Sequence, residues 1–133
     1  MERADLLIDS ATTRKWSNGV VTDPAVRLAE RRSETLGLVD ALTDRLAAII
    51  ESSRYTTNDD EHDPEGVTVA FERAQVAALL DQARAELRDL DAAGERLTAG
   101  TYGTCARCGH PIAPERLDAL PAATRCIRCA DRR

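Results

Sequence analysis

The chain has 133 residues, of which 31% are charged and only four are aromatic, and its formal net charge is −5. An apolar content dominated by Ala, Leu and Val favours helices over a sheet sandwich and argues against a large globular core. The negative charge argues against a chain that binds nucleic acid along its whole surface, so we expect a mainly α-helical, elongated protein.

Residues 1–23 have a mixed, weakly patterned composition, and we expect them to form a flexible N-terminal tail. Trp16, the one tryptophan, lies here, and a second interpretation has it dock on the body of the protein or on a partner. The first residues lack the apolar run of a signal peptide, and no stretch approaches the roughly 20 apolar residues of a membrane helix. We therefore expect a cytoplasmic protein that does not contact a membrane.

Residues 24–99 are predicted to form a long antiparallel coiled-coil hairpin, with helices at about 25–55 and 67–98. Asp23 followed by Pro24 is a typical helix start. In both helices a row of residues, here called the seam, recurs at alternating intervals of four and three, the heptad pattern of helices that pack side by side. The two rows match if the chain is reflected about residue 61, so that Leu42 should face Leu80. The seam comprises Leu28, Arg32, Thr35, Val39, Leu42, Leu46, Ile49 and Ser53, then Val69, Arg73, Val76, Leu80, Ala83, Leu87, Leu90, Gly94 and Leu97.

The predicted loop between the helices, residues 56–66, reads "TTNDDEHDPEG" and is rich in residues that break or start helices. An acidic turn is often simply a solvated turn. In this interpretation the sole role of Asp63 is to cap the N-terminus of the second helix. Exposed loops on rigid scaffolds also carry function, so we treat this loop as a candidate partner-binding tip. Its five acids give residues 59–65 a charge of −5, and they are Asp59, Asp60, Glu61, Asp63 and Glu65.

All four cysteines lie near the end of the chain, as Cys105 and Cys108 followed, after 17 intervening residues, by Cys126 and Cys129. Two CxxC pairs at this spacing predict a four-thiolate zinc site, in which each pair turns two sulfur atoms toward one ion. Protein thiolates would fill all four coordination positions, so we expect one structural Zn²⁺ that supplies folding free energy to a small finger, residues 100–133. A redox switch and an iron–sulfur site are the alternatives.

Details of the finger follow from its composition. Gly109 is expected to adopt a positive φ, and "APERLDALP" is expected to form a short helix between Pro114 and Pro121, with Leu117 and Leu120 facing one way. The arginines beside the ligands, Arg107, Arg125 and Arg128, can offset the negative charge of four thiolates. His110 is expected to be a surface residue rather than a ligand.

The stretch "GTYGTCARCGHPIAPERLDALPAATRCIRC", residues 100–129, resembles the C4 zinc finger of the DksA/TraR family. The resemblance extends back through "FERAQ" and the second predicted helix to about Ala70. It implies a transcription regulator rather than an enzyme, one that binds bacterial RNA polymerase and inserts an acidic-tipped hairpin into its secondary channel. Asp60 and Asp63 match the D-x-x-D part of the family's D-x-x-D-x-A tip pattern, whereas Glu65 replaces the alanine and Pro64 precedes it.

Two other functions are compatible with these features. Residues 105–133 carry a charge of +3, as expected of a zinc ribbon that binds DNA, but no base-reading helix or set of stacking aromatics is evident. The hairpin could instead belong to an adaptor that pairs with another protein. No Ser/His/Asp set, Cys/His nucleophile pair or glycine-rich phosphate loop points to catalysis. We expect a monomer without direct DNA contact.

Overall fold

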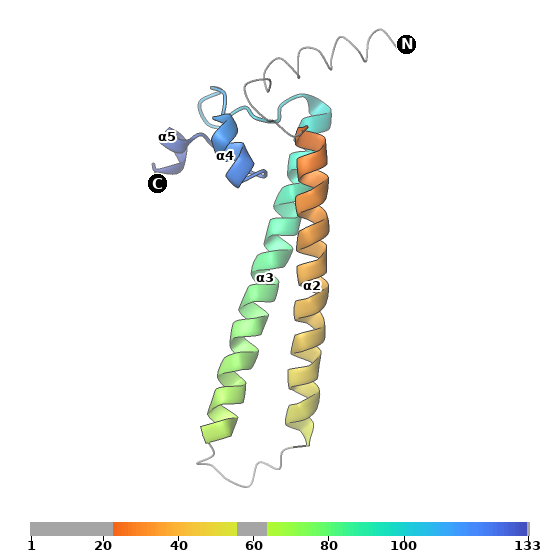
Figure 1. Ribbon diagram of the computed structural model, residues 1–133. Helices are drawn as coiled ribbons and strands as arrows, with labels where there is room; N and C mark the ends of the chain where they lie inside the picture. The colour runs from red at the N-terminus through yellow and green to blue at the C-terminus, as the bar shows by residue number, and fades with distance from the viewer. Residues whose placement is uncertain (1–22, 56–63, 133) are drawn as a thin grey trace. The chain divides into compact units, whose positions relative to one another are not determined.

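The structure, a computed structural model, describes residues 23–55 and 64–132. These residues form four helices, α2 (Pro24–Arg54), α3 (Pro64–Ala99), α4 (Pro114–Ala119) and α5 (Ile127–Ala130), so the fold is mainly α as predicted (Figure 1). The chain divides into two compact units. The described parts of Arg31–Asp91 are called the hairpin unit, and those of Met1–Glu30 and Ala92–Arg133 the finger unit.

The first helix begins where the sequence predicts. The backbone N–H of Ala25 donates a 3.0 Å hydrogen bond to the Asp23 carboxylate, which satisfies one of the unpaired donors of the first helical turn. Pro24 occupies the first helical position, where the missing N–H costs nothing. Helix α3 likewise begins at a proline, Pro64, three positions before the predicted start at residue 67.

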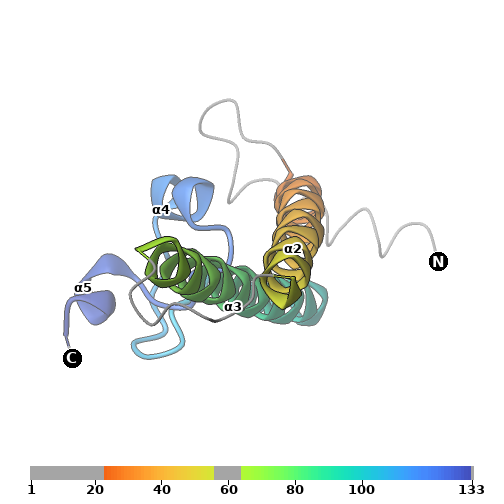
Figure 2. The ribbon, with the colours of Figure 1, turned by 90° about the horizontal axis from the view of Figure 1, so that it is seen from below.

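Within the hairpin unit, α2 and α3 run side by side in both views (Figures 1 and 2). Their core consists of seam residues from both helices and includes both Leu42 and Leu80. Burial of this row against the facing helix holds the two helices together. The buried members are Leu42, Ile49, Val76, Leu80 and Ala83, with Val39, Leu46 and Val69 packed against them.

The seam contains one buried polar side chain and differs from the prediction at three places. Thr35 is buried, and its hydroxyl donates a 2.8 Å hydrogen bond to the Arg31 carbonyl, so no polar group is left without a partner there. Arg32 and Arg73 were wrongly placed on the seam, since both are exposed. Ala93 is fully buried where the heptad count selected Gly94.

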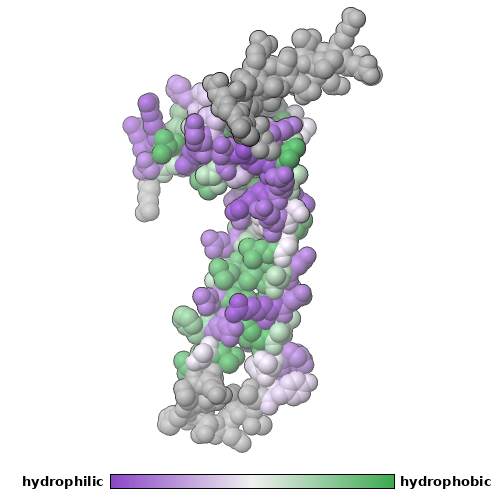
Figure 3. Space-filling view, in the orientation of Figure 1, coloured by the Kyte–Doolittle hydropathy of each residue, from purple (hydrophilic) through white to green (hydrophobic). Residues whose placement is uncertain are grey.

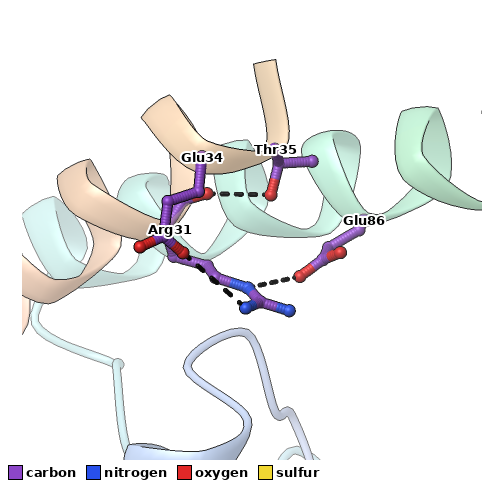
Figure 4. A network of polar contacts seen from close by, with 4 residues as sticks. All are labelled: Arg31, Glu34, Thr35 and Glu86. Atoms are coloured by element: carbon purple, nitrogen blue, oxygen red, sulfur yellow. Dashed lines mark hydrogen bonds and ion pairs between the residues drawn. The ribbon is translucent and has the colours of Figure 1, made fainter. Parts of the chain in front are cut away.

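Three ion pairs join the helices across the surface of the hairpin unit. Arg31 lies 2.7 Å from Glu86, Arg32 lies 2.7 Å from Asp91, and Arg45 lies 2.9 Å from Glu72. Early residues of α2 thus pair with late residues of α3, which fixes the antiparallel direction. Arg31 also approaches Glu34 of its own helix (Figure 4). Exposed pairs of this kind contribute about 0–1 kcal/mol each, so they align the helices more than they stabilise them.

On the face shown in Figure 3, hydrophilic residues alternate with hydrophobic ones along the hairpin unit. Among the described residues, no helix combines the length and the apolarity needed to cross a bilayer.

Replacement of a core leucine should destabilise the hairpin far more than replacement of its sequence neighbour. Leu80 is 3% exposed and Leu79 is 43% exposed. Leu80→Ala should lower the free energy of unfolding by about 2–5 kcal/mol because it removes buried methyl groups and leaves a cavity. Leu79→Ala is the matched control and should change it by less than about 1 kcal/mol. Urea denaturation followed by circular dichroism measures both, and equal losses would contradict the core described above.

Candidate metal centre

The first cysteine pair lies in a tight hairpin of the backbone. Cys105 donates its N–H to the carbonyl of His110 at 2.8 Å, and Gly109 donates to the carbonyl of Cys105 at 3.0 Å. Gly109 has φ +75°, as predicted, a conformation that disfavours residues with a Cβ. The turn therefore brings the side chains of Cys105 and Cys108 to the same side.

The second pair begins α5. Cys126 precedes the helix with an extended backbone, and the N–H groups of Cys129 and Ala130 donate to its carbonyl at 3.1 and 2.9 Å. A further backbone hydrogen bond, from the N–H of Ala106 to the carbonyl of Thr124 at 2.8 Å, joins the two CxxC turns, here called knuckles. Residues that are distant in sequence are thereby held with their sulfur atoms facing one another.

The four sulfur atoms all lie within 4.8 Å of one another. The sulfur atoms of Cys108 and Cys126 are 3.7 Å apart, and a tetrahedron with Zn–S bonds of about 2.3 Å has edges of about 3.8 Å. All four cysteines are free of disulfides, with Cys105 and Cys129 buried and Cys108 exposed. The cluster therefore fits one structural Zn²⁺ with four thiolate ligands and no position left for a reactive water.

The surroundings of the cluster favour ionised sulfur at Cys105 and Cys126 and oppose it at Cys129. Backbone N–H groups of Cys108 and Cys126 lower the pKa of the Cys105 thiol to about 5. The N–H of Cys129 lowers the pKa of Cys126 in the same way. Burial, with the neighbouring thiols, raises the pKa of Cys129 to about 12. A divalent cation deprotonates the thiols that coordinate it. A bound metal would therefore stabilise the thiolate form of Cys129, which burial otherwise disfavours.

A small apolar core lies beside the sulfur cluster. Tyr102, Ile112 and Leu117 are buried, and the Tyr102 hydroxyl donates a 2.8 Å hydrogen bond to the carbonyl of Pro121. Burial raises the pKa of this phenol. Helix α4 confirms the short helix predicted after Pro114, but Leu120 lies beyond its last residue and is 52% exposed, so the expectation that Leu120 faces inward with Leu117 is wrong.

Two arginines of the finger bind backbone carbonyls, which the sequence did not indicate. Arg116 Nε donates to the carbonyl of Arg125 at 2.9 Å, and Arg107 Nη1 donates to that of Arg132 at 3.2 Å. Arg125 and Arg128 are exposed. His110 is also exposed and does not belong to the group of potential ligands, in agreement with the prediction.

The finger unit also includes the end of α3 and the start of α2. Arg27 of α2 forms an ion pair with Asp118 of α4. Arg96 of α3 donates a 3.4 Å hydrogen bond to the carbonyl of Ala122. These contacts attach both helices to the segment between the two cysteine pairs.

The predicted tip is only partly covered by the structure. Asp59, Asp60, Glu61 and Asp63 lie outside the described residues. Glu65 lies in the first turn of α3. Trp16 and the rest of the predicted tail before Asp23 also lie outside the described residues.

The fold and the cysteine cluster define a class of proteins that consist of a helical hairpin and a C-terminal four-cysteine finger. Residues 100–133 match the family model of the prokaryotic dksA/traR C4-type zinc finger. The resemblance found in the sequence is thus confirmed, and the C-terminal segment is a zinc finger of the DksA/TraR type.

Two curated proteins of undescribed function are similar to parts of the chain. An uncharacterized protein of Aquifex aeolicus is 47% identical over 47 residues, covering 35% of this chain and 32% of that protein. The uncharacterized protein YteA of Bacillus subtilis is 40% identical over 65 residues, covering 49% of this chain and 27% of YteA. The chain thus spans about a third or less of the curated relatives it matches.

Two solved structures are also similar over most of the chain. Transcription factor DksA2 from Pseudomonas aeruginosa is 27% identical, with 80% of this chain and 82% of that chain covered and a TM-score of 0.48. The DnaK suppressor protein from Agrobacterium tumefaciens is 28% identical, with 85% and 96% covered and a TM-score of 0.40.

Gly109 and Gly37 make a matched pair for testing the knuckle. An added Cβ would meet no atom within 4 Å at either position, so space is not limiting. At Gly109 the positive φ makes alanine cost about 1–2 kcal/mol, and Gly109→Ala should release zinc to a competing chelator more readily. Gly37 lies inside α2, and Gly37→Ala should stabilise the hairpin by about 0.5–1 kcal/mol without changing zinc retention. Equal zinc retention in both variants would contradict the claim that zinc binding needs a glycine at position 109.

Replacement of one sulfur should abolish stable zinc binding. Cys126→Ser removes a thiolate from the cluster, and metal analysis of the purified variant should give a zinc content well below that of the wild type. Thr104→Ser, beside Cys105, changes no sulfur and should retain zinc. Full zinc content in Cys126→Ser would show that this cysteine is not a ligand.

Proposed function

We propose that this chain is a cytoplasmic, monomeric transcription regulator of the DksA/TraR type that binds bacterial RNA polymerase directly. In this proposal Cys105, Cys108, Cys126 and Cys129 hold the zinc of a finger spanning residues 100–133. Residues 24–99 form the hairpin, whose acidic loop enters the secondary channel of the polymerase. The observation that carries the proposal is the match of residues 100–133 to the dksA/traR zinc finger.

The hairpin unit has the mechanical properties that such a role requires. Helices α2 and α3 are continuous through it, and one shared core with three interhelical ion pairs holds them in register. Each helix is only about 10–12 Å across with its side chains, so a pair of them is a narrow element. A rigid, narrow pair of helices can present a loop within a confined channel without unfolding.

The segment that joins these helices, together with the first turn of α3, is the most acidic part of the chain, with a charge of −5 over residues 59–65. We infer that Asp60 and Asp63 act on the polymerase, with Asp59, Glu61 and Glu65 adding negative potential. Low-dielectric walls of a channel focus electric fields, so carboxylates act there more strongly than in open water. Hard cations such as Mg²⁺ prefer carboxylate oxygen and are one possible target of the loop.

The finger gives less support to the alternative that the chain is a DNA-binding zinc ribbon. Arg107 and Arg116 bind backbone carbonyls of the finger, which leaves fewer arginines directed only to solvent. Four thiolates on Zn²⁺ also carry a charge of −2, which offsets most of the +3 of residues 105–133. We infer a regulator that acts through protein contacts and not an enzyme.

The proposal is tested by transcription in vitro with purified bacterial RNA polymerase, together with a binding measurement on the same samples. Asp60→Asn combined with Asp63→Asn should reduce the effect on transcription by more than tenfold, while binding largely survives. In this proposal each aspartate makes a charge-assisted contact, worth about 1.5–3 kcal/mol, in the step that alters transcription and not in the initial binding.

The control combines Asp40→Asn with Asp44→Asn, two exposed acids of α2. It removes the same charge and should leave both readouts unchanged. An unchanged transcriptional effect in the loop variant would exclude the tip mechanism. Failure of the wild-type chain to bind the polymerase would exclude the proposed function as a whole.

A further inference from the structure

The segment between the two cysteine pairs, residues 109–125, contacts both long helices within the finger unit. Arg27, in the first turn of α2, forms an ion pair with Asp118 of α4. Arg96, in the last turn of α3, donates a hydrogen bond of 3.4 Å to the carbonyl of Ala122. One short segment, here called the inter-cysteine segment, thus joins the start of one helix to the end of the other.

Tyr102 adds a third contact to the inter-cysteine segment. Its side chain is buried, and its hydroxyl donates a hydrogen bond of 2.8 Å to the carbonyl of Pro121. Burial raises the pKa of this phenol. The positive charges of Arg27 and Arg96 lower that pKa and the negative charge of Asp118 raises it, which places all three groups near the ring. The contacts made by the two helices therefore belong to one cluster around Tyr102.

Both ends of the inter-cysteine segment are fixed at the sulfur cluster. The segment begins directly after Cys108 and ends directly before Cys126, and the sulfur atoms of these two residues are 3.7 Å apart. The middle of the segment has little stability of its own. Helix α4 has six residues, no side chain caps its N-terminus, and Leu117 is its one buried residue. So short a helix is unstable in isolation, so its position depends on the two fixed ends.

We propose that zinc binding is coupled to the start of α2 through the ion pair between Arg27 and Asp118. When the metal is bound, the inter-cysteine segment is fixed at both ends, and Asp118 attaches the first turn of α2 to the finger. Loss of the metal releases the segment, and this attachment is lost although Arg27 is distant in the sequence from every ligand. The coupling requires only the zinc finger and is independent of the partner that the hairpin binds.

The exposure of the ion pair sets the size of the expected effect. The side chain of Arg27 is 20% exposed and that of Asp118 is 49% exposed. Water screens such a pair in part, so its loss should change a local equilibrium by about two- to fivefold. Linkage makes the coupling reciprocal. If zinc strengthens the attachment of α2, then breaking the attachment must weaken zinc binding by the same factor.

The first test measures hydrogen exchange of the full chain by mass spectrometry, with and without a zinc chelator. With zinc bound, Asp118→Asn should speed exchange at the backbone amides of residues 27–30 by about two- to fivefold and leave the end of α3 unchanged. In the wild type, zinc removal should speed exchange at both helix ends. In Asp118→Asn, zinc removal should change exchange at the start of α2 less than it does in the wild type.

The second test is a competition assay in which each variant and a chelator compete for zinc. Asp118→Asn should lower the zinc affinity by about two- to fivefold, as linkage requires. Asp118→Glu keeps the carboxylate and should restore most of the affinity. Glu115→Gln is the matched control, because it removes the same charge from the first turn of α4, and it should leave zinc affinity and exchange unchanged.

Three results would overturn the inference. The first is an equal effect of zinc removal on the start of α2 in the wild type and in Asp118→Asn. The second is an equal zinc affinity of these two proteins. The third is a loss of affinity in Glu115→Gln as large as that in Asp118→Asn, because the effect would then come from charge alone and not from the contact with α2.

Discussion

The packing of one row of aliphatic side chains between α2 and α3 is the interaction on which the hairpin unit depends. The row is thin because the chain has four aromatic residues, and its buried members are leucine, isoleucine, valine and alanine. Two-helix packing buries only one face of each helix, so little apolar area is available to offset the conformational entropy of ordering them. The interhelical ion pairs add alignment at small energetic gain. Such a unit is stiff along its length yet holds only a modest reserve of stability.

The finger unit relies on a different source of stability. Apart from the cysteines, its buried apolar side chains are Leu28, Ala93, Tyr102, Ile112 and Leu117, which are too few to fold a unit of this size by burial. The bonds between sulfur and zinc replace the missing core, and the backbone hydrogen bonds of the two knuckles direct the sulfur atoms toward one point. Hairpin and finger therefore respond to different perturbations, one to loss of aliphatic volume and the other to loss of metal.

Sequence periodicity located both helices and most of the seam because a regular helix repeats the same geometry at every turn. It failed at Ala93, since a straight helix has 3.6 residues per turn and drifts from a strict heptad count. The cysteine spacing located the metal centre because tetrahedral coordination by two CxxC pairs allows only a narrow range of sequence spacings. The contacts of Arg116 with the Arg125 carbonyl and of Tyr102 with the Pro121 carbonyl were not predictable, because they depend on an irregular loop that has no period. Exposure of Phe71 also needed the structure, since composition alone would place a phenylalanine inside.

All the ion pairs described in the two units use arginine as the cation. Residues 23–132 contain no lysine, and the single lysine of the chain is Lys15. A guanidinium keeps its charge at every pH at which proteins remain folded. Acetylation of lysine amines, which removes their charge, consequently has no target within residues 23–132. Lysine acetylation therefore cannot remove the cations of the ion pairs that align the hairpin, whereas in lysine-rich coiled coils it can.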